Sequence, residues 1–289
     1  MTKIKFLAVI LFTAIFASCS SGDDTSENTD NPSASGSFDF VYNNQTKKVN
    51  SWEAKKIDDY MQVKGLTSDG IVVNFVFNVY GNLYGATTSG ASAGSSVMTH
   101  EASEVFTSNT FTFTIAELNI ANKTIKVNFS GKLYTDGYDD ESDFVVISGA
   151  FNVPYINATP DIPGLGTFAK FNGNDWHGMA FDSSTTFSTQ ITTLNVQNDG
   201  EYSLGIVFPK GNLKTGTFSF TGNDFSNGIS LEKFDVATGE SVEYNVAGTI
   251  TYTTVAANYV EGTFSLTATH PDNDSQIVIT GGKFKEMTN

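Results

Sequence analysis

Arginine is absent from this chain, and all sixteen of its basic residues are lysines. Its 31 acidic residues outnumber them and give a formal net charge of −15. Nucleic-acid binding needs Lys and Arg side chains gathered on one surface to follow the phosphates. The composition therefore excludes nucleic acid as a partner. The acidity favours a soluble surface or the attraction of cations.

Cysteine and histidine are nearly absent as well. Cys19 is the only cysteine, so the chain has no internal disulfide and its body has no thiol for catalysis. His100, His177 and His270 do not have the spacing of zinc ligands. No Gly-x-Ser-x-Gly nucleophile elbow occurs. We therefore expect no enzyme, although two carboxylates are enough for glycan hydrolysis and sequence spacing does not reveal such a pair.

Long apolar runs are also missing. The longest extends from Phe6 to Phe16, interrupted by Thr13. It is shorter than the roughly 20 residues that a membrane-spanning helix needs. Lysines precede this run and small residues follow it, which is the pattern of a secretory signal. We predict a signal peptide over residues 1–18.

The small residues that end at Cys19 resemble the lipobox of bacterial lipoproteins. The resemblance implies that Cys19 carries acyl chains such as palmitate and becomes the mature N-terminus. A thiolate is a suitable nucleophile for accepting diacylglycerol, and several acyl chains hold a protein on a membrane. The alternative is a free cysteine in a signal peptide that is simply removed.

The segment Ser20-Ser21-Gly22-Asp23-Asp24 resembles the surface-export signals of Bacteroidota outer-membrane lipoproteins. This resemblance implies an outer-membrane anchor with the body facing the cell exterior; the alternative is a periplasm-facing anchor. Residues 20–37 consist mainly of Ser, Asp, Asn, Thr, Gly and Pro, a composition that buries no core. We predict a lipidated, disordered tether over residues 19–37.

The body of the chain shows apolar residues with period two, which is typical of strands with one solvated face. Examples are Thr110–Ile115, Thr217–Thr221 and Thr263–Thr269. Asn198-Asp199-Gly200 between two such runs indicates a hairpin. The only weak helical candidate is around Ser51–Met61. The pattern predicts an all-β fold.

Two halves of the body resemble each other in four places that occur in the same order. We therefore predict two tandem antiparallel β-sandwich or barrel-like repeats, over residues 38–155 and 167–289, joined by a linker over 156–166. The alternative is one continuous barrel or sandwich that uses strands of both halves. The matches are Trp52 with Trp176, Gly81-Asn82-Leu83 with Gly211-Asn212-Leu213, Lys126–Gly131 with Glu261–Leu266, and Val145–Phe151 with Ile277–Phe284.

The closing pattern of these halves is a Gly-Thr-Phe-Ser strand, an acidic turn and a Val-Ile-Thr-Gly-Gly-Lys-Phe strand. It resembles tandem small β domains in Bacteroidota outer-membrane lipoproteins of unknown function. The resemblance brings no catalytic residues with it.

Two groups of residues are candidates for a site. The first is an acidic loop that could bind calcium, since several carboxylates on one short loop supply the oxygens this ion prefers; the alternative is a solvated turn. Its members are Asp136, Asp139, Asp140 and Asp143. The second is a set of aromatic side chains on which sugars could stack; the alternative is a structural role in the core. Its members are Trp52, Tyr80, Tyr84, Tyr138 and Trp176.

Together these features predict a non-catalytic cell-surface lipoprotein that displays β domains for binding or adhesion to a glycan or protein ligand. Its partners would be the membrane, through the lipid, and a glycan or envelope protein. One alternative is a structural or assembly lipoprotein of the outer-membrane envelope. A third is a carboxylate-dependent glycan hydrolase.

Overall fold

The computed structural model describes residues 36–91 and 97–288, of which 68 % lie in strands and 2 % in helix. The predicted all-β fold is confirmed. The predicted signal peptide, Cys19 and nearly all of the tether lie outside these residues. The described residues belong to one compact unit over 34–289. No helix in the described ranges is long and apolar enough to cross a membrane.

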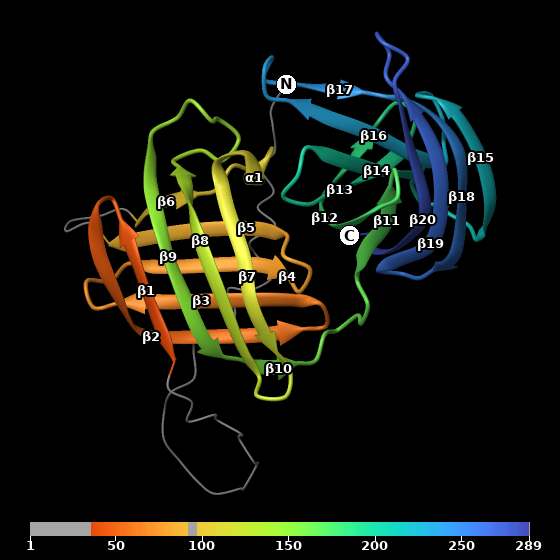
Figure 1. The fold of residues 1–289 in the computed structure, drawn as a ribbon. Coiled ribbons are helices and arrows are strands. Elements are labelled where there is room, and N and C mark those ends of the chain that lie inside the picture. Colours follow the sequence, from red (N-terminus) through yellow and green to blue (C-terminus); the bar gives the residue numbers. More distant parts are fainter. Residues whose placement is uncertain (1–35, 92–96, 289) are drawn as a thin grey trace, which may run out of the picture. The chain divides into compact units, whose positions relative to one another are not determined.

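The first sheet is a closed barrel, drawn in orange to green in Figure 1. Its hydrogen-bonded order is β1-β9-β8-β6-β5-β4-β3-β2-β10, with β7 paired to β8, and the pairing of β1 with β2 closes it. The pairs are antiparallel except that β10 runs parallel to β2. The elements are β1 (Ser37–Tyr42), β2 (Gln45–Ile57), β3 (Tyr60–Thr67), β4 (Val72–Asn78), β5 (Leu83–Ala91), β6 (Val97–Glu101), the short helix α1 (Thr107–Thr110), β7 (Phe111–Asn119), β8 (Thr124–Tyr134), β9 (Phe144–Pro154) and β10 (Ile156–Ala158).

The second sheet is an antiparallel half-barrel, drawn in green to blue in Figure 1. Its order is β15-β18-β19-β20-β11-β12-β13-β14-β16-β17, so β15 and β17 form its two edges. The strands are β11 (Gly166–Phe171), β12 (Asn174–Thr186), β13 (Ile191–Gln197), β14 (Tyr202–Pro209), β15 (Gly216–Gly222), β16 (Gly228–Asp235), β17 (Glu240–Glu243), β18 (Asn245–Val255), β19 (Tyr259–Thr269) and β20 (Gln276–Met287).

The two sheets share one strand order. The path β7-β8-β9-β1-β2-β3-β4-β5-β6 of the first sheet corresponds to β18-β19-β20-β11-β12-β13-β14-β16-β17 of the second. Phe129 lies opposite Gly149 in the pair β8–β9, and Phe264 lies opposite Gly282 in β19–β20. The predicted matches between these closing strands are therefore confirmed at the level of residue register. Of the described strands in the second sheet, only β15 has no counterpart.

The predicted match between the two tryptophans is wrong. Equivalent turns connect β1 to β2 and β11 to β12, with positive φ at Asn43 and Asn44 in one and at Asn172 and Gly173 in the other. Measured from these turns, Trp176 comes near the start of its strand, whereas Trp52 lies past the middle. Both halves have a tryptophan near their start in the sequence, but the two tryptophans differ in their distance from the equivalent turns.

The match between Gly81-Asn82-Leu83 and Gly211-Asn212-Leu213 is correct in position, but the next strands pair differently. Each segment comes directly after equivalent strands, β4 and β14. In the first sheet the next strand, β5, forms a hairpin with β4. In the second sheet the next strand is β15, which pairs with β18 instead. The second copy therefore contains an insertion at this point.

Each sheet encloses its own hydrophobic core. One cluster of buried side chains draws its members from residues 38–155 and the other from residues 169–284. Phe75 and Phe77 of β4 are fully buried in the first, as are Ile206 of β14 and Ile279 of β20 in the second. The alternative of one continuous barrel that uses strands of both halves is therefore wrong.

Two local predictions need correction. The helical candidate Ser51–Met61 is the hairpin of β2 and β3, where Ala54 and Met61 are buried at positions that a strand pattern places in the core. β10 lies within the predicted linker and pairs with β2.

Candidate ligand-binding groove

The aromatic side chains selected from the sequence do not share one surface. Trp176 is buried, and its ring stacks on Phe171 with centroids 5.1 Å apart. Trp52 packs half-buried against the first core and lines a hollow of about 480 Å³. Both tryptophans therefore have structural surroundings.

The three tyrosines also lie in separate surroundings. Tyr84 is half-buried, and its hydroxyl accepts a hydrogen bond from Asn78 at 2.9 Å. Tyr80 is half exposed, and one face of its ring is covered by His177, 3.8 Å away between centroids. Tyr138 is 64 % exposed, and it alone among the five selected aromatics lines a larger groove, of about 700 Å³.

The acidic loop adopts the hairpin turn between β8 and β9. Asp136 accepts a hydrogen bond from the backbone N–H of Tyr138, and Asp139 accepts one from that of Glu141. Asp140 and Asp143 are exposed. In the described part of the chain, no three His, Cys, Asp or Glu side chains are grouped so that they could hold a metal ion. The loop carboxylates therefore stabilise a turn and are not gathered around a cation position.

The three histidines are likewise far from forming a site. His100 is buried beside Tyr42. His177 stacks on Tyr80, and burial lowers its pKa. His270 accepts a hydrogen bond from the backbone N–H of Asp272 in a turn.

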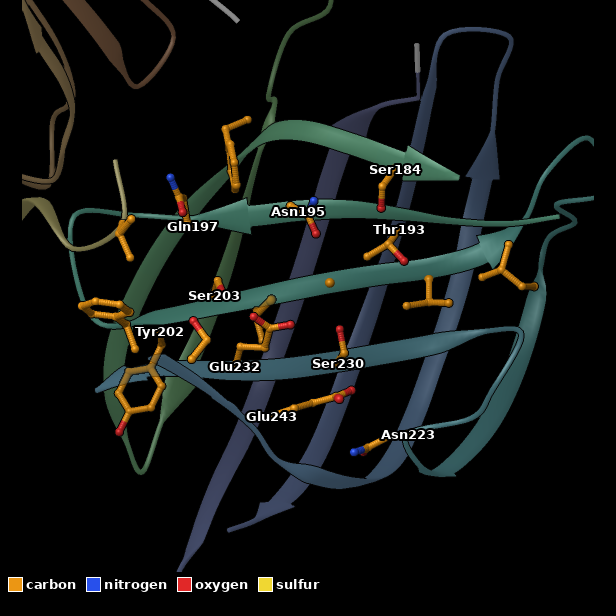
Figure 2. A pocket seen from close by; sticks show the side chains of 18 of the residues that line it. Ser184, Thr193, Asn195, Gln197, Tyr202, Ser203, Asn223, Ser230, Glu232 and Glu243 are labelled. Carbon is orange, nitrogen blue, oxygen red and sulfur yellow. The ribbon is translucent and has the colours of Figure 1, made fainter. Parts of the chain in front are cut away.

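The larger groove lies on the second sheet, over the face of β13, β14, β16 and β17 that points away from the core (Figure 2). Strand alternation explains its polarity. In β13 the core side carries Leu194 and Val196, and the groove side carries Thr193, Asn195 and Gln197. The hairpin at Asn198-Asp199-Gly200, predicted from the sequence, joins β13 to β14 and is confirmed.

Two rows of polar residues cross the groove floor from strand to strand. Gln197, Ser203, Glu232 and Glu243 lie directly opposite one another along β13, β14, β16 and β17. The neighbouring row consists of Asn195, Gly205 and Ser230. In Figure 2 these side chains stand on the same face of the sheet. The floor is therefore a ladder of amide, hydroxyl and carboxylate groups.

Gly205 keeps this floor open. A Cβ at this position would lie 2.3 Å from the Ser230 hydroxyl oxygen and 2.8 Å from the Thr193 methyl group. Such distances are far below van der Waals contact. The missing side chain lets Thr193 and Ser230 lean across the backbone of β14.

Two tyrosines lie at the groove, and the ring of one of them, Tyr202, faces the core side of β14. Tyr202 packs on Phe171 with centroids 5.5 Å apart, and burial, followed by the charge of Glu201, raises its pKa to about 12. Tyr138 contributes a ring from the loop between β8 and β9. Burial of its hydroxyl and a hydrogen bond with Glu104 raise its pKa. Both phenols therefore remain neutral hydrogen-bonding groups at physiological pH.

Two carboxyl groups of the groove, those of Glu232 and Glu104, have raised pKa values. Burial, and then the charge of Glu243, raise the pKa of Glu232. Burial raises the pKa of Glu104, whose backbone carbonyl accepts a hydrogen bond from Gln197 at 3.1 Å. Loss of water is the larger cause of both shifts, and neighbouring carboxylates add to them.

The groove was not predicted from the sequence, although the residues that form its floor stand in a regular pattern there. Thr193-x-Asn195-x-Gln197 and Ser230-x-Glu232 show the polar half of a period-two pattern. The same pattern occurs on every solvated strand face, so it carries no signal for a concave surface.

Comparisons with protein-family models, with curated proteins and with solved structures find no match for this chain.

Proposed function

We propose that the protein is a non-catalytic, lipid-anchored binding protein of the bacterial outer-membrane surface and that it holds a glycan in the groove of its second sheet. One observation carries the proposal: the groove floor presents rows of amide and hydroxyl side chains, and aromatic rings border it. Pockets for drug-sized ligands are mostly apolar, whereas this floor offers mainly hydrogen-bonding partners. A polyhydroxylated ligand matches it.

The hydrogen-bonding groups have the geometry that a sugar needs. Asn195 donates one amide N–H to Asp182 and Gln197 donates one to the Glu104 backbone carbonyl, so each keeps one N–H and its carbonyl oxygen for a ligand. Ser203 and Ser230 offer hydroxyls from the next two strands. The rings of Tyr138 and Phe234 supply apolar faces on which the C–H side of a pyranose can stack. The groove volume of about 700 Å³ has room for a short oligosaccharide.

Binding of neutral oligosaccharides to the purified full-length chain, measured by isothermal titration calorimetry, tests the proposal. Replacing Asn195 and Gln197 by Ala should abolish binding. Ser265→Ala, on the exposed outer side of β19, is the matched control and should leave binding intact. Binding that survives loss of both groove amides would overturn the assignment of the groove.

The lipid anchor is tested separately. Cys19→Ser should abolish incorporation of radiolabelled palmitate and release the chain from the membrane fraction. Surface exposure predicts that protease added to intact cells removes the body of the wild-type protein. Protection from the protease in intact cells would favour the periplasm-facing anchor.

The open edge of the second sheet favours one other function, that of an envelope assembly protein. β15 pairs with β18 on one side and is the last strand of the sheet on the other. An edge strand offers backbone N–H and C=O groups to a partner strand. Co-purification of an outer-membrane protein that is lost on Ser219→Pro, and not on loss of the groove amides, would support this function over glycan binding.

A further inference from the structure

The charge of the groove has one sign. The charged residues that line it are all acidic, and no lysine is among them. The nearest cation in sequence, Lys233, lies 3.3 Å from Glu201 and also contacts the Tyr202 ring. The acidic lining residues are Glu104, Glu201, Asp224, Glu232 and Glu243.

Two of these carboxylates occupy a costly arrangement. Glu232 on β16 and Glu243 on β17 lie directly opposite each other on the solvated face. Like charges in this position destabilise a sheet. None of the four ion pairs among the described residues includes either carboxylate. Repulsion that has no internal compensation is relieved when a positive group lies between the two carboxylates.

The surroundings of this pair fit a positive group attached to a sugar. Gln197 and Ser203 continue the same row toward β13, and they supply neutral hydrogen-bonding groups next to the carboxylates. Phe234 also lines the groove, two residues from Glu232 on the same side of β16. An aromatic face attracts a cation as well as the apolar side of a pyranose.

We propose that the groove binds a glycan with free amino groups and that one ammonium group lies at Glu232 and Glu243. This inference rests on the proposed function, because it names the ligand class of the same groove. The ammonium group replaces the mutual repulsion of the carboxylates by two charge-assisted contacts. Neighbouring sugar hydroxyls bond to Ser203, Gln197 and Asn195. Acidic glycans are repelled.

Calorimetric titration with glucosamine oligomers and with N-acetylglucosamine oligomers of equal length tests the proposal. Acetylation removes the positive charge and leaves the ring hydroxyls. We expect glucosamine oligomers to bind at least about ten-fold more tightly, the effect of one charge-assisted hydrogen bond. Added salt should weaken this preference. Oligogalacturonate should not bind.

Variants locate the effect. Glu232→Gln and Glu243→Gln should remove the preference for the amine, so that glucosamine and N-acetylglucosamine oligomers bind each variant with similar affinity. Glu240→Gln is the matched control, since this glutamate lies on β17 opposite Asp235 and outside the groove lining. The Gln variants should fold at least as stably as the wild type, because they remove repulsion.

The outcomes separate this inference from the proposed function. Equal affinity for the charged and acetylated oligomers, with loss of both in the Asn195/Gln197 variant, overturns the charge inference and keeps glycan binding. No binding of any oligomer overturns both. Lysine oligomers that bind through Glu232 and Glu243 as tightly as glucosamine oligomers would replace the glycan by a basic peptide.

Discussion

Glu286 predicts a specific dependence of stability on pH. This carboxylate on β20 is only 2 % exposed. It accepts hydrogen bonds from the Thr167 hydroxyl at 2.7 Å and from the backbone N–H of Ala180 at 3.2 Å. Two hydrogen bonds do not replace the hydration of an ionised carboxylate. Burial therefore raises its pKa from 4.5 to about 7.

The size and sign of the pH dependence come from the difference between the pKa of Glu286 in the folded chain and its ordinary value in the unfolded chain. Below about pH 4.5 the folded and unfolded chains both carry the proton, and the contribution of Glu286 to stability is fully present. As the pH rises toward about 7, the unfolded chain loses the proton while the folded chain keeps it, so stability falls. The total loss is about 3 kcal/mol and is complete above the folded-state pKa.

Urea unfolding of the wild type and of Glu286→Gln between pH 4.5 and pH 8.5 measures this loss. Glutamine is neutral and similar in shape to glutamate, so the free energy of unfolding of the Glu286→Gln variant lacks the pH-dependent contribution of residue 286. The difference between the two proteins should change by about 3 kcal/mol across the range, in favour of the variant at high pH. Tyr60 and Tyr84 interact with Glu286, but their own raised pKa values keep them neutral throughout. Parallel curves for the two proteins would refute the reasoning.

Two further substitutions test the groove and the core. Gly205→Ala places a methyl group 2.3 Å from the Ser230 hydroxyl; we expect glycan affinity to fall and the free energy of unfolding to drop by about 1–3 kcal/mol, and unchanged calorimetric affinity would contradict the role of this floor. Trp176→Ala should lower the free energy of unfolding by about 3–5 kcal/mol in urea titrations, because its indole is buried beside Phe171. Glycan affinity of the folded variant should be unchanged, and a selective loss of binding would restore Trp176 as a ligand platform.

The strands and their duplication were predictable because their signals are local. Alternation at Thr110–Ile115 and the Phe-Ser motifs of the closing strands are readable in short windows, and Phe129 and Phe264 occupy the same register. The tryptophan match failed because register is counted from a turn. Asn43-Asn44 and Asn172-Gly173 differ in sequence, although both adopt positive φ.

The groove was not predictable for a different reason. Thr193, Asn195 and Gln197 have the same pattern as any solvated strand face. Whether such a face becomes a groove depends on the curvature of the sheet and on segments from elsewhere in the chain. Asn223 and Phe225, which come after the inserted β15, also line it. Curvature arises from twist and strand number, which no single segment encodes.

The strand β15 distinguishes the two sheets, which share one strand order but differ in closure. In the first sheet β6 meets β8 through Glu101 and Tyr134. In the second sheet β15 occupies the edge of β18, and β17 ends the sheet at the other side. The radius of a closed barrel is set by its number of strands and their stagger. An open sheet does not have this constraint. The second sheet, with its additional strand β15, can therefore adopt a curvature that depends on the segments packed against it.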